Sequence, residues 1–374
     1  MRVGSSRHHP PFHRQLRKIK PMSDNAEILF ERRGAIALVT LNRPKALNAL
    51  TLGMIRLFDP QLRAWDADPE VKAVVIQGAG EKAFCAGGDV VSLYEAGKAA
   101  RAGSGDGSAI RAFFSGEYIL NRLIKRLSKP YVALIDGISM GGGVGLSEHG
   151  THRVVTERTL FAMPETGIGL YPDVGGTYFL PRLPGQTGTW LGLTGERLKA
   201  ADMLAVGAAD AFVPSAKLDD LIADLAAGTP PDEAIAKVKD SAGDAPNAVH
   251  RAAVDRCFAF NTVEEIVASL TAEGTEWAAG QLTTLKRVSP TSLKVTLEAI
   301  RRGASLDFDG CMVQELRLSI AFLDGVDFYE GIRAALVDKD RNPKWSPADL
   351  AEVGPADVAR HFAEPTGGDL VFPA

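Results

Sequence analysis

Short apolar runs alternate with helical patterns along the first half of the chain. Residues 35–41 and 71–77 are rich in Val, Leu and Ile, and apolar runs of this length predict buried strands. Residues 51–65, between them, predict a helix. The same order returns at residues 131–135, a predicted strand, with a predicted helix after the glycines at 141–143. We therefore expect an α/β fold with repeated crossovers.

The pattern changes further along the chain. Residues 153–156 and 160–163 still predict two short strands. After about residue 227 the apolar positions follow only a helical period, most clearly in residues 247–259, 262–270 and 291–301. A helical part is therefore expected to follow the α/β core.

A domain boundary is predicted at the Thr-Pro-Pro run that begins at Thr229. Single hydrophobic cores rarely grow past about 250 to 300 residues, and this chain has 374. We expect a leader in residues 1–22, a catalytic core in residues 23–228 and a helical domain in residues 229–374.

Two segments contribute little to a core. Residues 1–22 are basic, contain proline and carry no acid, which predicts a disordered leader, with a transit peptide as the alternative and Met22 as an alternative start. Residues 99–108 consist mainly of Ala, Gly and Ser. They predict a mobile loop, suited to act as a lid, before a helix that begins near Ala109.

Composition narrows the classes of function. The net charge of -4 gives no general reason to bind nucleic acid or an anionic membrane, and no run approaches the roughly 20 apolar residues of a membrane helix. Three widely spaced cysteines fit neither a disulfide framework nor a zinc site. We expect a soluble cytoplasmic protein, or a mitochondrial matrix protein if the leader is a transit peptide.

The strongest chemical signal lies within residues 129–183. The predicted strand at 131–135 leads through a turn into three glycines at 141–143 that open a helix. The first amides of a helix are unpaired and lie at the positive end of its dipole, so such a turn binds a developing negative oxygen. Tight packing of the helix on the sheet is the alternative, and a phosphate-binding loop is disfavoured because no Gly-Lys-Ser/Thr follows.

A second glycine turn occupies residues 82–89. Asp89 is predicted to cap the helix that begins at Val90. If the amides of Gly88 and Gly142 face each other, they form an oxyanion hole in which each donor is worth roughly 3 kcal/mol at the transition state.

Two acids lie in an apolar, glycine-rich segment. Glu165 and Asp173 are eight residues apart along the chain. Burial of a carboxylate is costly and raises its pKa toward the range useful for catalysis, so these are the preferred catalytic pair. The alternative is that both cap turns or pair with Arg153 and Arg182.

A third acid interrupts the apolar stripe of a predicted helix. Glu117 shares one helical face with Phe113, Leu120, Ile124 and Leu127. Residues of this kind are more often partly solvated or salt-bridged than catalytic, so both interpretations remain open on the residues alone.

Other groups are weaker candidates. Glu148, His149 and His152 lack the spacing and the further ligand of a zinc site, so no metal is expected. Cys85 lies in an apolar strand without a histidine nearby in sequence, which predicts a small buried hydrophobe.

Four motifs together resemble the crotonase (enoyl-CoA hydratase/isomerase) superfamily. They are LNRP at residues 41–44, AFCAGGD at 83–89, GISMGGG at 137–143 and MPET at 163–166. The resemblance covers about residues 26–225, and a narrower resemblance to a hydrolase branch extends to the run DKDRNPKW at its C-terminal end, residues 338–345.

The superfamily resemblance implies a crotonase-like ββα spiral core in which the amides of Gly88 and Gly142 bind a thioester oxygen. It implies an acyl-CoA substrate, with no cofactor beyond the CoA that is part of that substrate, and association into homo-oligomers. CoA commonly lies along the loop at residues 42–47, which makes Arg43 and Lys45 candidate contacts.

A departure from the hydratase pattern favours hydrolysis. Hydratases hold water between two glutamates, and the first of these positions is Gly145 here, so that only Glu165 remains. Asp173 stands where hydratases have glycine. A hydratase or isomerase of the same fold, and a non-catalytic acyl-CoA-binding protein, are the competing interpretations.

The hydrolase resemblance assigns Glu117, Gly142, Glu165 and Asp173 to the substrate site. It implies thioester hydrolysis of a 3-hydroxyacyl-CoA in valine breakdown. In the resulting hypothesis Glu165 attacks the thioester carbonyl or activates water, Gly88 and Gly142 hold the oxyanion, and the other acids orient the 3-hydroxyl group and water.

Overall fold

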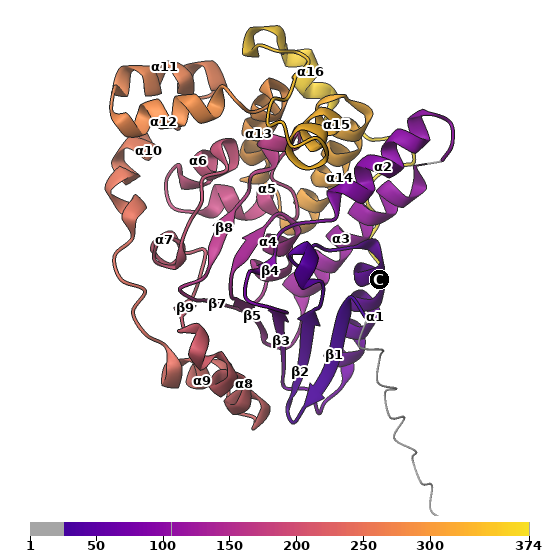
Figure 1. Cartoon of the computed structure of the whole chain (residues 1–374), viewed down its shortest axis with the longest axis vertical. Helices are drawn as coiled ribbons and strands as arrows, with labels where there is room; N and C mark the ends of the chain where they lie inside the picture. Colours follow the sequence, from indigo (N-terminus) through magenta and orange to yellow (C-terminus); the bar gives the residue numbers. More distant parts are fainter. Residues whose placement is uncertain (1–25, 106, 374) are drawn as a thin grey trace, which may run out of the picture.

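A six-stranded sheet forms the centre of the computed structural model of the protein, which describes residues 26–105 and 107–373 (Figure 1). Its order is β1-β2-β3-β5-β7-β9, in which β1 is antiparallel to β2 and the other neighbours are parallel. A second sheet contains three short parallel strands in the order β4-β6-β8. The strands are β1 (Ile28–Arg33), β2 (Ile36–Leu41), β3 (Ala73–Gly78), β4 (Ala83–Cys85), β5 (Tyr131–Ile135), β6 (Ile138–Met140), β7 (His152–Val155), β8 (Leu160–Ala162) and β9 (Ala211–Phe212).

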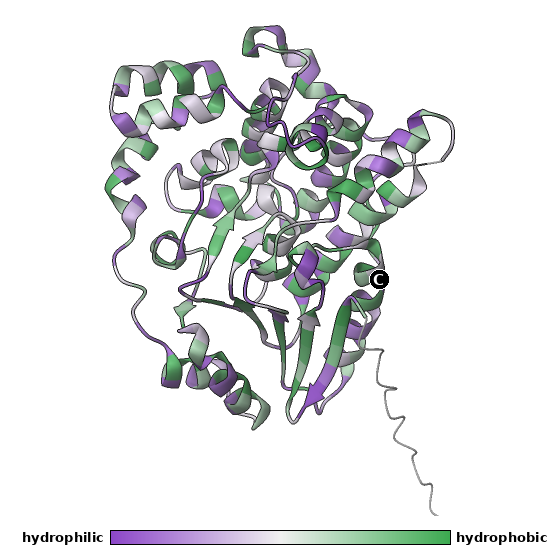
Figure 2. Cartoon of the chain, viewed as in Figure 1, coloured by the Kyte–Doolittle hydropathy of each residue, from purple (hydrophilic) through white to green (hydrophobic). Residues whose placement is uncertain are grey.

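Both faces of the six-stranded sheet are buried, which explains the near-continuous apolar runs of its parallel strands. Along β2, Ala37 and Val39 belong to the main hydrophobic cluster, whereas Ile36 belongs to a second cluster on the opposite face. Helices α8 (Leu218–Ala226) and α9 (Pro231–Val238) supply the other side of this second cluster. Figure 2 shows the strands as mainly hydrophobic, apart from the polar end of β1.

Repeated ββα units determine where the chain turns. Strands β3, β5 and β7 of the large sheet are each followed by a strand of the small sheet and then by a helical segment. Because the strands of the small sheet are parallel, their carboxyl ends meet at one edge. Gly88, Gly142 and Glu165 follow these three ends. The expected crotonase-like spiral is confirmed.

The predicted helices are present, and the helices that follow residue 250 lie in the upper part of Figure 1, whereas α9 lies at the bottom beside α8. Within the described part of the chain, no strand follows β9. The remaining helices are α1 (Leu52–Ala67), α2 (Val90–Arg101), α3 (Ser108–Arg126), α4 (Gly142–Ser147), α5 (Gly176–Phe179), α6 (Thr187–Thr194), α7 (Ala200–Ala205), α10 (Arg251–Cys257), α11 (Val263–Glu273), α12 (Glu276–Leu285), α13 (Pro290–Gly303), α14 (Phe308–Asp324), α15 (Asp327–Ile332) and α16 (Pro355–Arg360).

The main hydrophobic cluster joins the two predicted domains. It contains Val144 of α4 together with Leu316 of α14. Helix α9, just beyond the predicted boundary, packs against the sheet of the core. The boundary at residue 229 stays a prediction.

The loop predicted at residues 99–108 begins too early, because residues 99–101 form the end of α2. Contacts with residues far away in the sequence hold the last turn of this helix. The Arg101 guanidinium lies 4.0 Å from the ring centre of Tyr329 and donates hydrogen bonds to the carbonyl oxygens of Leu323 and Gly325. The lid function stays a prediction.

Two other sequence predictions concern the ends and the environment of the chain. The leader at residues 1–22 lies outside the described residues. In residues 26–105 and 107–373, no helix combines the length and the apolar character needed to cross a bilayer.

Candidate active site

A cavity of about 190 Å³ lies at the edge where the strands of the small sheet end. The ββα turns, helix α3 and Leu336 from the helical C-terminal part contribute to its wall. The wall includes all five residues that the sequence predicts for the site: Gly88, Glu117, Gly142, Glu165 and Asp173. The structure therefore brings these residues together, while their chemical roles stay predictions.

The two candidate oxyanion amides are neighbours. A Cβ atom added to Gly142, the first residue of α4, would lie 3.2 Å from the amide nitrogen of Gly88. Among the described residues, neither amide donates a backbone hydrogen bond. Gly87 and Gly141 have φ values of +112° and +46°, which favour glycine. The turns thus expose two unpaired donors to one small volume.

Glu117 faces this oxyanion region from α3. Its side chain is 2% exposed, and its Oε1 atom has no hydrogen-bond partner among the described residues. A Cβ at Gly142 would lie only 2.6 Å from that oxygen. The alternative of a solvated or salt-bridged Glu117 is wrong, because the face of α3 that carries Glu117 is buried from Phe113 to Ile124, and α3 packs against α1 and α14.

Glu165 begins the 3-10 helix η2 (Glu165–Ile168), directly after β8. It is 4% exposed, and its Oε2 atom has no partner within the described chain. Its Oε1 atom lies 3.1 Å from a Cβ added to Gly141. The carboxylate is therefore beside the oxyanion turn and free of structural hydrogen bonds at one oxygen.

Asp173 lies on the turn between η2 and α5. Its Oδ2 atom accepts a hydrogen bond of 2.8 Å from the Tyr118 hydroxyl. The alternative pairing with arginine is wrong: Arg153 pairs with Glu148 and Asp210, and Arg182 donates to backbone carbonyls. Asp173 is thus available to the cavity.

Burial dominates the electrostatics of the three acids. It raises the pKa values of Glu117 and Glu165 well above the ordinary carboxyl range, and the negative charge of Asp173 raises both further. Desolvation also raises the pKa of Asp173, to about 6, against the opposing effect of the Tyr118 hydrogen bond. Among the described residues, no Lys or Arg lines the cavity. Burial therefore makes all three acids hold their protons more tightly than exposed carboxyl groups do, a feature of acids that exchange protons in catalysis.

A fourth buried acid was missed by the sequence analysis. Glu315 of α14 is fully buried and accepts hydrogen bonds from the amides of Gly175 and Thr177, at 2.8 and 3.0 Å. Burial raises its pKa to about 8. It anchors the turn after Asp173, where Val174 has a φ of +51° that is strained for a β-branched residue. Only the fold reveals this role, because 140 residues separate Glu315 from Gly175.

The other sequence candidates have structural contacts. Asp89 caps α2 as predicted, by accepting a hydrogen bond of 3.3 Å from the Ser92 amide. It also pairs with Arg43, which pairs in turn with Glu27. Arg43 is therefore already neutralised, while Lys45 is exposed. Contact of either residue with CoA stays a prediction.

The candidate residues for metal binding or nucleophilic chemistry have structural contacts instead. Glu148 pairs with Arg153, the His149 Nε2 atom lies 2.6 Å from the Val174 carbonyl oxygen, and His152 pairs with Asp232. In the described chain no group of three or more His, Cys, Asp or Glu side chains is arranged for a metal ion. Cys85 is a buried hydrophobe, as predicted, and burial raises the pKa of its thiol to about 12.

Gly145 leaves no room for a second glutamate. A Cβ at this position would lie 2.7 Å from the Val174 Cβ atom and 2.8 Å from the Asn121 Nδ2 atom. Both neighbours are buried, so a larger side chain would have to displace packed atoms. Packing thus maintains the departure from the two-glutamate pattern.

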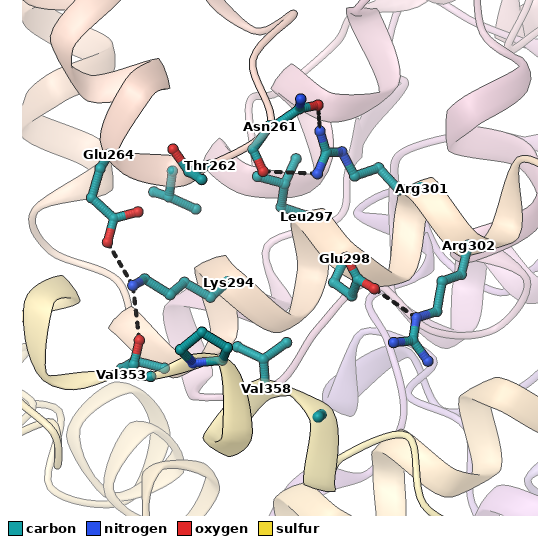
Figure 3. A pocket seen from close by; sticks show the side chains of 14 residues that line it. Asn261, Thr262, Glu264, Lys294, Leu297, Glu298, Arg301, Arg302, Val353 and Val358 are labelled. Atoms are coloured by element: carbon teal, nitrogen blue, oxygen red, sulfur yellow. Dashed lines mark hydrogen bonds and ion pairs between the residues drawn. The ribbon is translucent and has the colours of Figure 1, made fainter.

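A larger cavity, of about 300 Å³, lies among residues of α11, α13 and α16 (Figure 3). Its charged groups already have partners: Lys294 pairs with Glu264, and Arg302 pairs with Glu298. The Arg301 guanidinium donates hydrogen bonds to the carbonyl oxygens of Asn261. Among the described residues its wall contains one glycine, Gly354, whose amide donates a hydrogen bond to Asp357. The smaller cavity is therefore the candidate active site.

Comparisons with known proteins identify the family of the chain. A family model described as enoyl-CoA hydratase/isomerase matches residues 36–362. The chain is similar to a Danio rerio protein named "3-hydroxyisobutyryl-CoA hydrolase, mitochondrial", with 51% identity over 92% of this chain and 91% of the relative. A Homo sapiens protein of the same name is 48% identical over 96% of this chain and 94% of the relative.

Solved structures show the same similarity across both parts of the chain. A carnitinyl-CoA dehydratase from Mycobacterium thermoresistibile has a TM-score of 0.88 and 45% identity, with coverage of 93% of this chain and 99% of the other. An enoyl-CoA hydratase from Rhodobacter sphaeroides 2.4.1 has a TM-score of 0.86 and 42% identity, with coverage of 93% and 100%. The C-terminal helices are therefore shared with these relatives.

Proposed function

The chain belongs to the enoyl-CoA hydratase/isomerase family, and we propose that it hydrolyses the thioester of 3-hydroxyisobutyryl-CoA to 3-hydroxyisobutyrate and CoA, a step of valine catabolism. The relatives named as 3-hydroxyisobutyryl-CoA hydrolases, about half identical over more than nine tenths of the chain, carry this conclusion. The three buried acids of the cavity and the two unpaired amides of Gly88 and Gly142 supply groups suited to thioester hydrolysis.

The reaction divides among the residues of the cavity. The amides of Gly88 and Gly142 hold the thioester oxygen as negative charge develops on it. Glu165 attacks the carbonyl carbon or removes a proton from the attacking water. The carbon–sulfur bond then breaks, CoA leaves as a thiolate, and water supplies the new oxygen of the acid product.

The other two acids serve substrate recognition in this proposal. Asp173 and Glu117 are close enough to the oxyanion turn to meet the 3-hydroxyl group and the hydrolytic water. The unpartnered Glu117 oxygen supports this role, because a buried oxygen without a hydrogen bond favours a ligand that donates one. A site that reads a hydroxyl in this way rejects an analogue without it by about 10⁴-fold.

Hydration is the competing reaction, since two solved relatives carry dehydratase and hydratase titles. Gly145 and its packed surroundings argue against it. Incubation with 3-hydroxyisobutyryl-CoA should release free thiol, whereas incubation with crotonyl-CoA should leave the enoyl absorbance unchanged. Loss of enoyl absorbance without thiol release from the first substrate would overturn the proposal.

The rate of thiol release should fall as the pH drops through about 6. An acid is ionised above its pKa and protonated below it, and burial raises the pKa of Asp173 to about 6 and that of Glu165 well above its ordinary range. Acidification therefore protonates Glu165, which attacks or accepts a proton, and Asp173, which orients the 3-hydroxyl group and the water. Initial rates from about pH 5 to about pH 9 test this, and a rate that stays constant down to about pH 5 would contradict it.

The remaining predictions extend the proposal to the cell. We propose a location in the mitochondrial matrix if residues 1–22 act as a transit peptide, and in the cytoplasm otherwise; the relatives above are mitochondrial by name. The acyl-CoA ester is the expected partner, without nucleic acid, membrane or a separate cofactor. Homo-oligomerisation stays a prediction that sedimentation velocity tests.

A further inference from the structure

We propose that Tyr118 is a positioning residue for thioester hydrolysis: its hydroxyl fixes one oxygen of Asp173 and is itself held by Ser319 from the C-terminal helix α14. This inference rests on the proposed function and deepens it. It adds to the predicted acids a residue that does not line the cavity, and it gives the C-terminal helices a part in the chemistry.

The contacts form a closed cluster of hydroxyl groups. Tyr118, the residue after Glu117 on α3, is fully buried and donates its 2.8 Å hydrogen bond to Asp173 Oδ2. The Ser319 Oγ atom lies 2.6 Å from the Tyr118 oxygen and 3.0 Å from the Tyr171 oxygen. The Tyr171 hydroxyl donates to the Glu315 carbonyl oxygen at 2.6 Å.

The number of hydroxyl protons determines the direction of these bonds. Each hydroxyl has a single proton to donate, and carbonyl or carboxylate oxygens only accept. Tyr118 donates to ionised Asp173, and Tyr171 donates to the Glu315 carbonyl. Ser319 must therefore be the donor to one of the two tyrosine oxygens, and the shorter contact, 2.6 Å against 3.0 Å, assigns its proton to Tyr118. The resulting chain runs from Ser319 through Tyr118 to Asp173, and each bond polarises the next.

The direction of the Tyr118 hydrogen bond makes Tyr118 a positioning residue and not a catalytic one. The proton of Tyr118 is committed to Asp173 and is not available to a substrate. Its effect is to hold the carboxylate in one orientation beside Glu165 and to favour the ionised form of Asp173. A second buried tyrosine offers a comparison, because the Tyr131 hydroxyl donates only to the Leu146 carbonyl oxygen, at 3.1 Å.

The test is Tyr118→Phe in the full chain, with Tyr131→Phe as the matched control. Both changes remove one buried hydroxyl and keep the ring. We expect Tyr118→Phe to lower kcat for thiol release about 10-fold, with KM changed much less, since a hydrogen bond to a charged group is lost. The acid side of its pH profile should move up by about one pH unit, because the Tyr118 hydrogen bond holds the pKa of Asp173 down and its loss lets that pKa rise.

Tyr131→Phe should keep both kcat and the pH profile, with a fall in Tm similar to that of Tyr118→Phe. A Tyr118→Phe protein with unchanged kcat and pH profile would overturn the proposal. Equal losses of kcat in both variants, without a shift of the profile, would do the same by showing general destabilisation.

Ser319→Ala tests the chain of donors without changing either tyrosine, and it replaces Tyr118→Phe if that variant does not fold. It should shift the profile in the same direction by a smaller amount, and a folded Ser319→Ala protein with no shift would overturn the proposal. Thiol release by the unchanged protein tests the proposed function separately. Infrared difference spectra follow the protonation of carboxyl groups without turnover, and the Asp173→Asn variant identifies the signal of Asp173. These spectra should show the same shift in the pKa of Asp173.

Discussion

Glu165→Gln is expected to lower kcat for thiol release from 3-hydroxyisobutyryl-CoA by at least about 10³-fold while binding of the CoA ester is retained. Glutamine has nearly the same shape, but its neutral amide neither attacks a carbonyl nor accepts a proton. The fold should not suffer: ionisation of Glu165 is disfavoured by burial, so removing that charge keeps or raises the Tm at neutral pH. Free-thiol assays, calorimetry and thermal unfolding measure the three quantities.

Glu148→Gln is the matched control for this change. Glu148 is also buried, with a pKa raised to about 7, but it pairs with Arg153 and does not line the cavity. It should lose stability and keep its turnover. Normal turnover in Glu165→Gln would remove Glu165 from its proposed role.

Isotope labelling separates the two roles left open for Glu165. If the carboxylate attacks the thioester, an anhydride forms between Glu165 and the acyl group as CoA leaves, and a single turnover in H₂¹⁸O places the label in the Glu165 side chain when water attacks the glutamyl carbonyl carbon. If Glu165 only activates water, the label appears in 3-hydroxyisobutyrate alone. Mass spectrometry of the protein and of the product distinguishes these outcomes.

Local sequence patterns were sufficient for the parts of the site that lie next to strand ends. Gly142 and Glu165 could be identified because each lies just after a strand of its own ββα unit. The three strands without a sequence prediction, β1, β6 and β9, are harder to read. Two of these, β6 and β9, have only three and two residues, too short for a period to show.

Long-range contacts could not be predicted in this way. Nothing near Glu315 or Ser319 in the sequence indicates that α14 packs behind Asp173, because their partners lie 138 to 201 residues away. The end of α2 shows the same limit, since Arg101 is held by residues more than 220 positions away. Resemblance to a family supplied Glu117, whose burial the helical pattern alone left open.

Gly142→Ala is expected to lower kcat for thiol release by about 10²- to 10³-fold, the effect of losing one oxyanion donor. The backbone of Gly142 is helical and accepts alanine, so the cost comes from the added methyl group. That carbon would lie 2.6 Å from the Glu117 Oε1 atom and 3.2 Å from the Gly88 amide nitrogen. It must therefore displace the acid or occupy the space between the two amides. Thiol-release kinetics and thermal unfolding measure the result.

Gly167→Ala provides the control for this last change. Gly167 lies on η2, two residues from Glu165, but a Cβ there meets no atom within 4 Å. The control should keep kcat, because it adds the same methyl group to the same region without entering the oxyanion turn. Full turnover in Gly142→Ala with an unchanged Tm would show that the reacting oxygen is held elsewhere. Loss of turnover in both variants would instead show that the region tolerates no added atoms, and the argument from the two amides would fail.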